Sequence, residues 1–338
     1  GEDKDRETKL SILQSSRSIN NEYLKDKFRK IQPDKHNNWI DQGNPEFDSF
    51  PPLISKPPSP QDIFKMSSFG MVTSRDSWCV NFSRKKLAKN LQQMISFYNS
   101  EVRRFKNADW SGNIDSFVNP DPKKISWGVN MKSGIKKGNE REFQENLIRT
   151  SSYRPFTKTF AYTDKNFIHS FYSQEKIFPT PESENRVISV TGTGARSGFS
   201  ALVTDQIPNF HFLDTAQHFP LFMFEGKRSE LSLLNGLEDL SSRGWNAIQI
   251  QGFDEIAEKI STTNITYSDY FNYIYAVLHS KEYRLQFVNN LAKQLPRIPI
   301  VTNSSKFHDF VSAGKLLSDI HINFEYQEKF PVLIKEGD

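Results

Sequence analysis

Six prolines fall between Asn44 and Gln61, and this segment restricts the folds open to the chain more than any other. Proline fixes its backbone φ angle and carries no amide N–H, so a run of this density excludes a helix. The segment is predicted to be extended or loop, serving as a linker or as an arm tethered over the next domain. Before it, the apolar spacing of Thr8–Ile31 predicts a helix. Residues 1–60 are therefore interpreted as a helical and proline-rich connector.

Beyond the prolines, helical and strand patterns follow one another along the chain. Apolar residues recur at helical spacing over Arg84–Lys106, which predicts an amphipathic helix with basic ends. Asn107–Gly138 has few apolar residues and is predicted to be a long exposed loop with one short helix. Met71–Phe82 is predicted to form two short strands around a turn, which places Cys79 in a strand. Further strands are predicted within Leu147–Phe171, Arg186–Leu202 and Phe210–Phe224, and helices over Thr266–Leu295 and Lys306–Phe324.

These elements together predict an α+β fold. A mixed, sheet-containing half is expected over residues 61–235, followed by a mostly helical C-terminal subdomain over residues 236–338. The 28 phenylalanines indicate a core rich in aromatic side chains.

The single cysteine, Cys79, excludes a disulfide framework and any multi-cysteine metal site. No apolar run is long enough to span a bilayer, so no membrane association is expected. The polar start at Gly1 lacks the pattern of a signal peptide and is interpreted as the scar of a cleaved tag. Together these features predict a cytoplasmic protein, or an excised piece of a longer one.

Positive charge is concentrated in one part of the chain. Residues 75–165 contain 18 Lys and Arg against nine Asp and Glu, a net charge of +9 in a chain whose total is +4. A basic block in an otherwise acidic chain favours an electrostatic face for a polyanion. A lysine-rich solvated surface is the alternative.

The basic block supplies most of the candidate DNA-binding residues. Paired cations on loops and helix ends suit phosphate contacts, and arginines can read guanine edges bidentately. Phosphate contacts are predicted for Lys85, Lys86, Lys123, Lys124, Lys136 and Lys137. Base-edge or groove contacts are predicted for Arg75, Arg103, Arg141, Arg154 and Arg196, and Arg84, Arg104 and Tyr153 complete the predicted interface. Arg154 and Arg297 each abut a proline, so both could instead be structural arginines that fix turns.

Three short motifs suggest other chemistry. Gly192-Thr193-Gly194 after a strand is similar to nucleotide-site turns, but it lacks a correctly spaced third glycine, so a plain turn is favoured. Asn44-Pro45-Glu46-Phe47 is one residue from the Asn-Pro-Pro-aromatic signature of amino-methyltransferases, and Glu46 removes its rigid geometry, so a loop is favoured. Asp214, Glu225 and Lys227 fit the loose pattern of Mg²⁺-dependent nucleases, which leaves a nuclease as an alternative. No catalytic or metal site is assigned.

Several stretches of the sequence resemble one family. The matching stretches are Thr73–Asp76, MISFYN at 94–99, IRTSSYRPF at 148–156, Ile177–Thr180, Phe219–Leu221, the run 269–299 that contains YIYAVLHS and LPRIP, Ala313-Gly314 and Leu316–His321. They keep their order over about residues 60–335. They resemble the C-terminal target-recognition region of Type ISP single-chain restriction–modification enzymes and of related N6-adenine DNA methyltransferases.

The resemblance implies a division of labour within a longer polypeptide. Enzymes of this family carry a nuclease, a helicase-like motor, an N6-adenine methyltransferase and a target-recognition domain. The chain is accordingly expected to recognise a specific duplex DNA sequence and to present the target adenine to a catalytic domain outside it. Residues 1–60 would connect it to the upstream methyltransferase, and the methyltransferase and motor domains would be its partners. S-adenosylmethionine, ATP and Mg²⁺ are expected in the other domains and no cofactor in this chain. A protein-docking module without DNA affinity is the remaining alternative.

Overall fold

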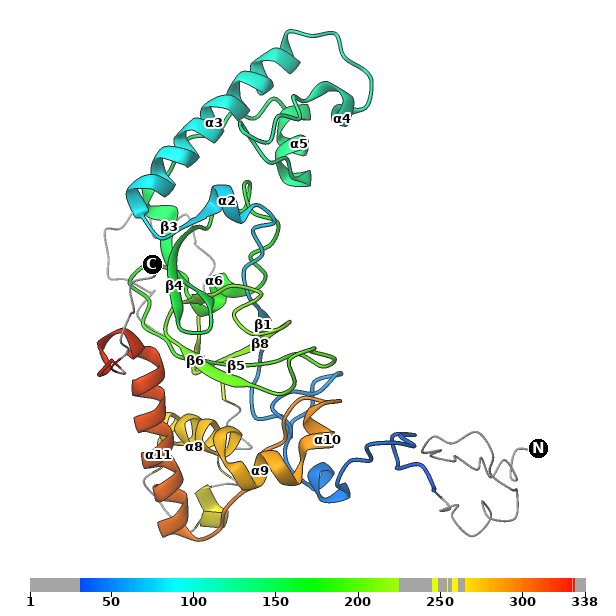
Figure 1. Cartoon of the computed structure of the whole chain (residues 1–338), viewed down its shortest axis with the longest axis vertical. Helices are drawn as coiled ribbons and strands as arrows, with labels where there is room; N and C mark the ends of the chain where they lie inside the picture. The colour runs from blue at the N-terminus through cyan, green and yellow to red at the C-terminus, as the bar shows by residue number, and fades with distance from the viewer. Residues whose placement is uncertain are drawn as a thin grey trace, which may run out of the picture.

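The computed structural model describes residues 31–224, 245–248, 254, 257–260, 265–329 and 331. The helix predicted over Thr8–Ile31 falls almost entirely outside these residues. Strands form the middle of the molecule, with one group of helices on either side (Figure 1). Helices α3 (Arg84–Lys106), α4 (Ile114–Phe117) and α5 (Val129–Lys136) lie on one side. The opposite side carries α8 (Tyr267–His279), α9 (Lys281–Gln286), α10 (Val288–Leu291) and α11 (Ser304–Ile322). The α+β prediction is confirmed.

The first sheet is antiparallel and has the strand order β1-β8-β5-β6. Its strands are β1 (Ser68–Phe69), β8 (Gln217–Pro220), β5 (Val187–Val190) and β6 (Ala201–Thr204). All four residues of β5 are buried, as expected for a strand between two covered faces. Val203 of β6 donates its backbone N–H to the Tyr275 hydroxyl of α8, 3.1 Å away, which ties this sheet to the C-terminal helices.

The second sheet has the order β2-β4-β3-β7. Strands β3 (Ile148–Arg154) and β4 (Thr157–Tyr162) form an antiparallel hairpin, confirming the strand pattern of that stretch. The hairpin turns at Phe156, whose φ of 52° is unusual for a residue other than glycine. Short strands β2 (Val80–Asn81) and β7 (Ile207–Pro208) complete the sheet, and β7 runs parallel to β3. A separate ribbon pairs β9 (Phe222–Met223) with β10 (Trp245–Asn246).

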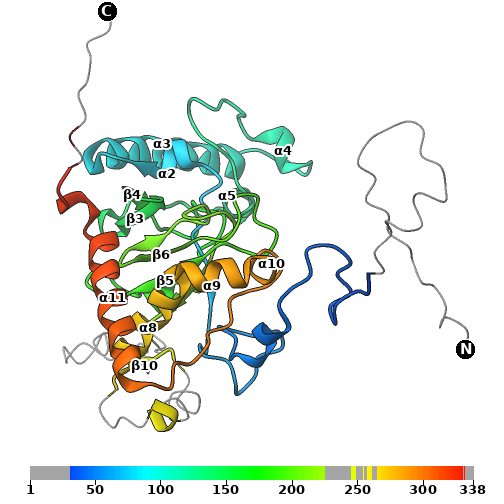
Figure 2. The same ribbon diagram turned by 60° about the horizontal axis from the view of Figure 1, so that its bottom comes forward.

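Helix α3 has the bounds that its apolar spacing predicts. Ser83 caps its N-terminus by accepting a hydrogen bond from the backbone N–H of Lys86. One stripe of the helix is buried over its whole length: Leu87, Leu91, Met94, Ile95, Tyr98, Glu101 and Val102. Helix α3 lies at the outside of the molecule, beyond the strands (Figure 2), and the stripe opposite the buried one is exposed.

Two sequence predictions about the surroundings of α3 are wrong. The first concerns Met71–Phe82, which contains the single-turn helix α2 (Asp76–Cys79) before β2, so Cys79 ends a helical turn. The second concerns segment 107–138, which contains two short helices, α4 and α5, instead of one, with irregular and largely exposed chain around them. Its scattered apolar residues Ile114, Phe117 and Ile125 are buried against α3, so tertiary contacts compensate for the low apolar content.

The buried apolar residues form two main cores. One joins α3–α5 to the hairpin β3–β4. The other joins β5, β6 and β8 to α8–α11 and also takes in Phe47 and Leu53 from the proline-rich segment. That segment begins with the 3₁₀ helix η1 (Pro45–Ser49), which the prediction did not include, and continues as loop with bends and turns up to β1. The division at residues 60 and 235 stays a prediction, since residues from all three predicted parts share the second core.

Candidate nucleic-acid interface

The exposed surface of α3 carries four of the nine predicted DNA-binding residues that are exposed, namely Lys85, Lys86, Arg103 and Arg104. Residues three and four apart fall on one side of a helix. The buried stripe therefore leaves a second stripe, here named the outer face of α3, whose exposed members are Lys85, Lys86, Lys89, Gln92, Gln93, Ser96, Ser100, Arg103 and Arg104. The outer face has no acidic residue, because the single acidic residue of α3, Glu101, lies in the buried stripe.

The first turn of α3 has an unfavourable charge arrangement. It contains Arg84, Lys85 and Lys86 and no acidic residue. The N-terminal end of a helix carries positive partial charge, so cations there raise the free energy of the folded chain. A bound polyanion would compensate this repulsion.

All six lysines predicted to contact phosphates are exposed: Lys85, Lys86, Lys123, Lys124, Lys136 and Lys137. None of them takes part in an ion pair within the described part of the chain. The Nζ atom of Lys124 lies 5.4 Å from the centre of the Phe97 ring, which holds segment 107–138 beside α3. Their exposure is compatible with phosphate contacts, which stay a prediction.

Arg103 and Arg104 differ from these lysines because each has a carboxylate partner. The Nε and Nη2 atoms of Arg103 donate to Glu140 Oε2 at 3.0 and 2.7 Å. Arg104 donates to both oxygens of Glu101, at 2.8 and 2.7 Å, and its guanidinium lies over the Phe117 ring. Burial raises the pKa of Glu101, but the hydrogen bonds from Arg104 and from the Asn119 N–H outweigh it and lower that pKa overall. Arg104 thus anchors α4 to α3.

Arg75 lies in the interior, with 6% of its surface exposed. Its Nε donates to the Ser126 carbonyl oxygen at 3.0 Å and its Nη1 to the Phe167 carbonyl oxygen. Burial lowers the pKa of this guanidinium. In this conformation Arg75 joins three chain segments, and we leave it out of the interface.

Arg84 and Arg141 also make local contacts. Arg84 donates to the carbonyl oxygens of Ile148 and Glu145, at 2.9 and 3.1 Å, and so ties the start of α3 to the hairpin. The backbone N–H and carbonyl of Arg141 are both bound by the Asn99 side chain, at 2.9 and 2.8 Å. These contacts fix the backbone around α3.

Tyr153 and Arg154 stand together at the end of β3. The Arg154 guanidinium carbon lies 4.0 Å from the centre of the Tyr153 ring, and its Nη1 donates to Asn209 Oδ1 at 3.2 Å. The Tyr153 hydroxyl donates to Asp76 Oδ2 at 2.8 Å. Both side chains are half-buried. These contacts are compatible with a structural role for Arg154, and its predicted DNA contact stays a prediction.

Arg196 is exposed in the turn that contains Gly194, whose φ is +80°. Its backbone N–H donates to Asp214 Oδ2 at 2.8 Å, and the Asp214 carbonyl oxygen accepts from the Gly192 N–H at 3.1 Å. Asp214 therefore organises this glycine turn. The other two members of the nuclease pattern, Glu225 and Lys227, lie outside the described residues.

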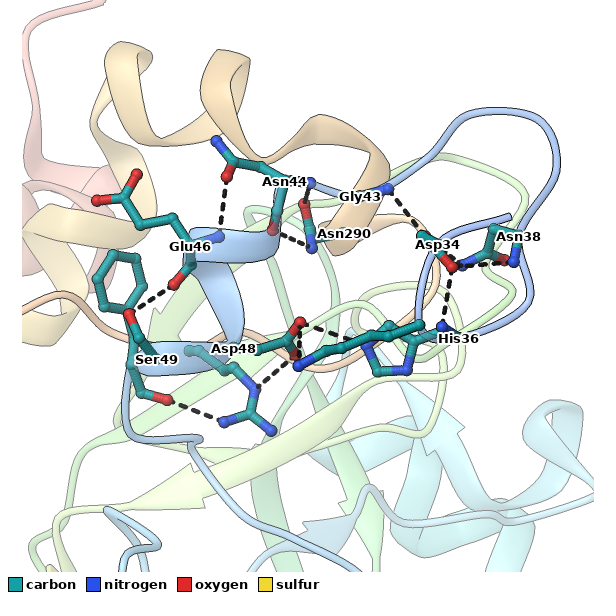
Figure 3. Close-up of polar contacts among 12 residues, drawn as sticks. Asp34, His36, Asn38, Gly43, Asn44, Glu46, Asp48, Ser49 and Asn290 are labelled. Atoms are coloured by element: carbon teal, nitrogen blue, oxygen red, sulfur yellow. Dashed lines mark hydrogen bonds and ion pairs between the residues drawn. The ribbon is translucent and has the colours of Figure 1, made fainter. Parts of the chain in front are cut away.

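A polar cluster surrounds Asp48 in the proline-rich segment (Figure 3), and Arg297 contributes to it. The Nη1 atom of Arg297 donates to the Phe50 carbonyl oxygen at 2.9 Å. Asp48 lies at the centre of the cluster, 2.8 Å from Lys35 Nζ and 3.9 Å from Arg297 Nε. Burial opposes ionisation of Asp48, yet the hydrogen bonds from Lys35 and His36 lower its pKa overall. Arg297 is a structural arginine that holds the proline-rich segment.

Several residues of the outer face are not among those predicted from the charge distribution. Lys89 belongs to this face, as do Gln92, Gln93 and Ser96, which carry no charge and so escape a charge count. Exposed Lys106 extends the basic surface at the end of the helix. The three- and four-residue spacing that identifies the helix also locates these residues opposite the apolar stripe.

The fold and this surface define an α+β domain that presents an acid-free, cation-rich helix face, a surface suited to a polyanion. Residues 62–338 match the family described as the Type ISP C-terminal specificity domain. The chain belongs to this family, as the resemblance of its motifs predicts.

Three solved structures with a similar fold are complexes of longer proteins with DNA or a DNA mimic. A nuclease-deletion mutant of the Type ISP restriction–modification enzyme LlaGI, in complex with a DNA substrate mimic, matches with a TM-score of 0.73 and 30% identity. The match covers 92% of this chain and 27% of that one. A DrdV–DNA complex matches with a TM-score of 0.73 and 26% identity. That match covers 90% of this chain and 28% of the DrdV chain. The ATP-dependent Type ISP restriction–modification enzyme LlaBIII bound to DNA matches with a TM-score of 0.73 and 26% identity. That match covers 91% of this chain and 19% of the LlaBIII chain.

This chain thus spans less than a third of the length of these three proteins. A search among curated proteins found no match. None of the helices described here is both long and apolar enough to cross a membrane.

Proposed function

We propose that this chain recognises a specific sequence in double-stranded DNA, as the target-recognition domain of a restriction–modification polypeptide. The observation that carries the proposal is the acid-free outer face of α3 in a chain that belongs to the Type ISP specificity-domain family. The solved relatives support the choice of ligand, because two are complexes with DNA and one is a complex with a DNA substrate mimic.

In a longer polypeptide the domain would hold the duplex so that a methyltransferase domain outside it reaches the target adenine. Such a division leaves S-adenosylmethionine, ATP and Mg²⁺ to the other domains. The methyltransferase and motor domains would be its protein partners. The proposed role of the chain itself is binding.

The proposal is tested by recovering bound sequences from a random duplex pool, at low and then at physiological salt. An enriched motif that persists at the higher salt is the expected result. If the chain binds DNA at low salt without enriching a motif, and this binding is lost at physiological salt, the domain has only a non-specific basic surface. Absence of binding at both salt concentrations would favour a docking module.

A further inference from the structure

The middle of the outer face of α3 has the chemistry of base reading. Lysines lie at its N-terminal end and arginines at its C-terminal end, and between them are Gln92, Gln93 and Ser96. A glutamine amide can bind both N6 and N7 of adenine, and a serine hydroxyl can donate to or accept from any base edge. Neutral hydrogen-bonding side chains flanked by cations suit sequence readout in a groove, because the cations can bind phosphates while the neutral groups reach base edges.

These three side chains are available for a ligand. The hydrogen bonds and ion pairs within the described part of the chain do not engage the side chains of Gln92, Gln93 or Ser96. Ser100 differs, because its hydroxyl donates to the Phe97 carbonyl oxygen at 2.7 Å. The candidate readers are therefore the three residues before that turn.

The dimensions of the helix fit the major groove. The outer face from Lys85 to Arg103 is about 27 Å long at the usual rise of 1.5 Å per residue. The major groove of B-DNA is about 12 Å wide and admits an α-helix. With the helix in the groove, its middle turns would face base edges and the lysines at its N-terminal end would reach phosphates.

The helix is also held rigidly. Leu87, Leu91 and Val102 of its inner stripe are completely buried, and the Tyr98 hydroxyl donates to the Asn139 carbonyl oxygen at 2.9 Å. A reading helix needs this support, because side chains on a fixed backbone lose less entropy when they bind.

We infer that α3 is the recognition helix of this domain, that it lies in the major groove, and that Gln92, Gln93 and Ser96 determine sequence preference. Lys85, Lys86 and Lys89 then bind phosphates at the edge of the groove. The inference rests on the proposed function and adds the residues that read the sequence.

The test compares the DNA motif of the unchanged 338-residue chain with those of Gln92→Ala, Gln93→Ala and Ser96→Ala. Each variant is expected to relax one or two positions of the motif and to weaken binding to the preferred site about 5- to 100-fold. The dependence of affinity on salt should stay the same, because no phosphate contact is removed. Gln61→Ala and Ser312→Ala replace exposed residues far from α3 and should leave the motif intact.

The possible outcomes separate the inference from the proposed function. A motif from the unchanged chain that all three variants reproduce, with equal affinity, would overturn the inference and leave the proposed function standing. Failure of the unchanged chain to select any motif would overturn the proposed function and the inference with it. Unaltered thermal unfolding of each variant confirms that an altered motif reflects contacts and not misfolding.

Discussion

Asn290 binds the backbone of Asn44 in both directions across 246 positions of sequence. The Asn290 Oδ1 atom accepts the Asn44 N–H at 2.8 Å, and its Nδ2 atom donates to the Asn44 carbonyl oxygen at 3.2 Å (Figure 3). Gly43 packs so closely on this amide that an added Cβ would lie 2.6 Å from Nδ2. The buried asparagine of α10 therefore fixes the entry of the proline-rich segment into the domain.

Asn290→Ala should lower the free energy of unfolding by about 1–3 kcal/mol, because it leaves the half-buried N–H and carbonyl of Asn44 without partners. Urea denaturation measures this change. Asn289→Ala is the matched control, since Asn289 makes one 3.0 Å hydrogen bond, to the Gln42 carbonyl oxygen, at the exposed surface. Equal destabilisation by the two substitutions would contradict the role given to Asn290.

Arg75→Ala should destabilise the chain by more than about 2 kcal/mol, because the carbonyls of Ser126 and Phe167 lose their donors. Burial raises the pKa of the nearby Cys79 thiol to about 12, so a thiol reagent reacts with Cys79 only when the chain opens. Faster labelling of Cys79 in the variant, together with a lower urea midpoint, is the expected result. Arg196→Ala, at an exposed position, should change neither the labelling rate of Cys79 nor the urea midpoint. Equal labelling rates and equal urea midpoints in the two variants would contradict the structural role given to Arg75.

Removal of Lys85, Lys86 and Lys89 together should weaken binding to all duplexes alike. Each lost phosphate contact lowers the slope of log affinity against log salt by about 0.9, so the triple alanine variant should lose up to about three in slope. Titrations of DNA binding at several salt concentrations provide the measurement. The double variant Lys306→Ala/Lys315→Ala, on exposed positions of α11, is the charge control. A triple variant with the slope of the unchanged chain would place the DNA on another face.

Stability should fall in mildly acidic solution because of His218. Burial lowers the pKa of its imidazole from 6.5 to about 3, so between these values the unfolded chain binds a proton that the folded chain does not. The effect is absent above pH 6.5, grows as pH falls, and reaches about 2 kcal/mol at pH 5. Unfolding free energies at pH 7.5 and pH 5 measure it.

A double variant isolates the contribution of His218. Its Nδ1 lies 2.8 Å from the Ser189 hydroxyl, so His218→Leu with Ser189→Ala removes both partners of this hydrogen bond. The loss of stability between pH 7.5 and pH 5 should shrink by about 2 kcal/mol in this variant. Replacing exposed His308 should leave the fall in unfolding free energy between pH 7.5 and pH 5 unchanged. If that fall were also unchanged in the double variant, His218 would already be protonated in the folded chain at pH 5, contrary to the prediction.

The sequence predicts best the elements whose stability is local. Helix α3 has the predicted bounds because a continuous apolar stripe, a Ser83 cap and favourable residues agree. Helix α8 begins where expected, since Thr266 and Asp269 form a capping box. The hairpin β3–β4 likewise follows from alternation of its side chains.

The sequence predicts poorly whatever depends on distant partners. Segment 107–138 has too few apolar residues to show a pattern, and it folds because α3 offers Ile114 and Ile125 a surface to pack on. The burial of Arg75 depends on carbonyls supplied by Ser126 and Phe167, which no spacing rule connects with it. A search for charge likewise cannot select Gln92 and Gln93, whose significance comes from the face they share with the lysines.

The pairing of the proline-rich segment with the stretch between α10 and α11 also affects the order of synthesis. Leu53 donates its backbone N–H to the Pro296 carbonyl oxygen at 3.1 Å, and Ile298 donates to the Pro51 carbonyl oxygen at 2.9 Å. A nascent chain therefore carries Phe47 and Leu53 without their partners until about 240 further residues have been made. Exposed apolar surface during translation invites aggregation and chaperone binding. The second core closes only when α10 and the residues after it leave the ribosome, so translation arrested before that point yields a domain with one complete core.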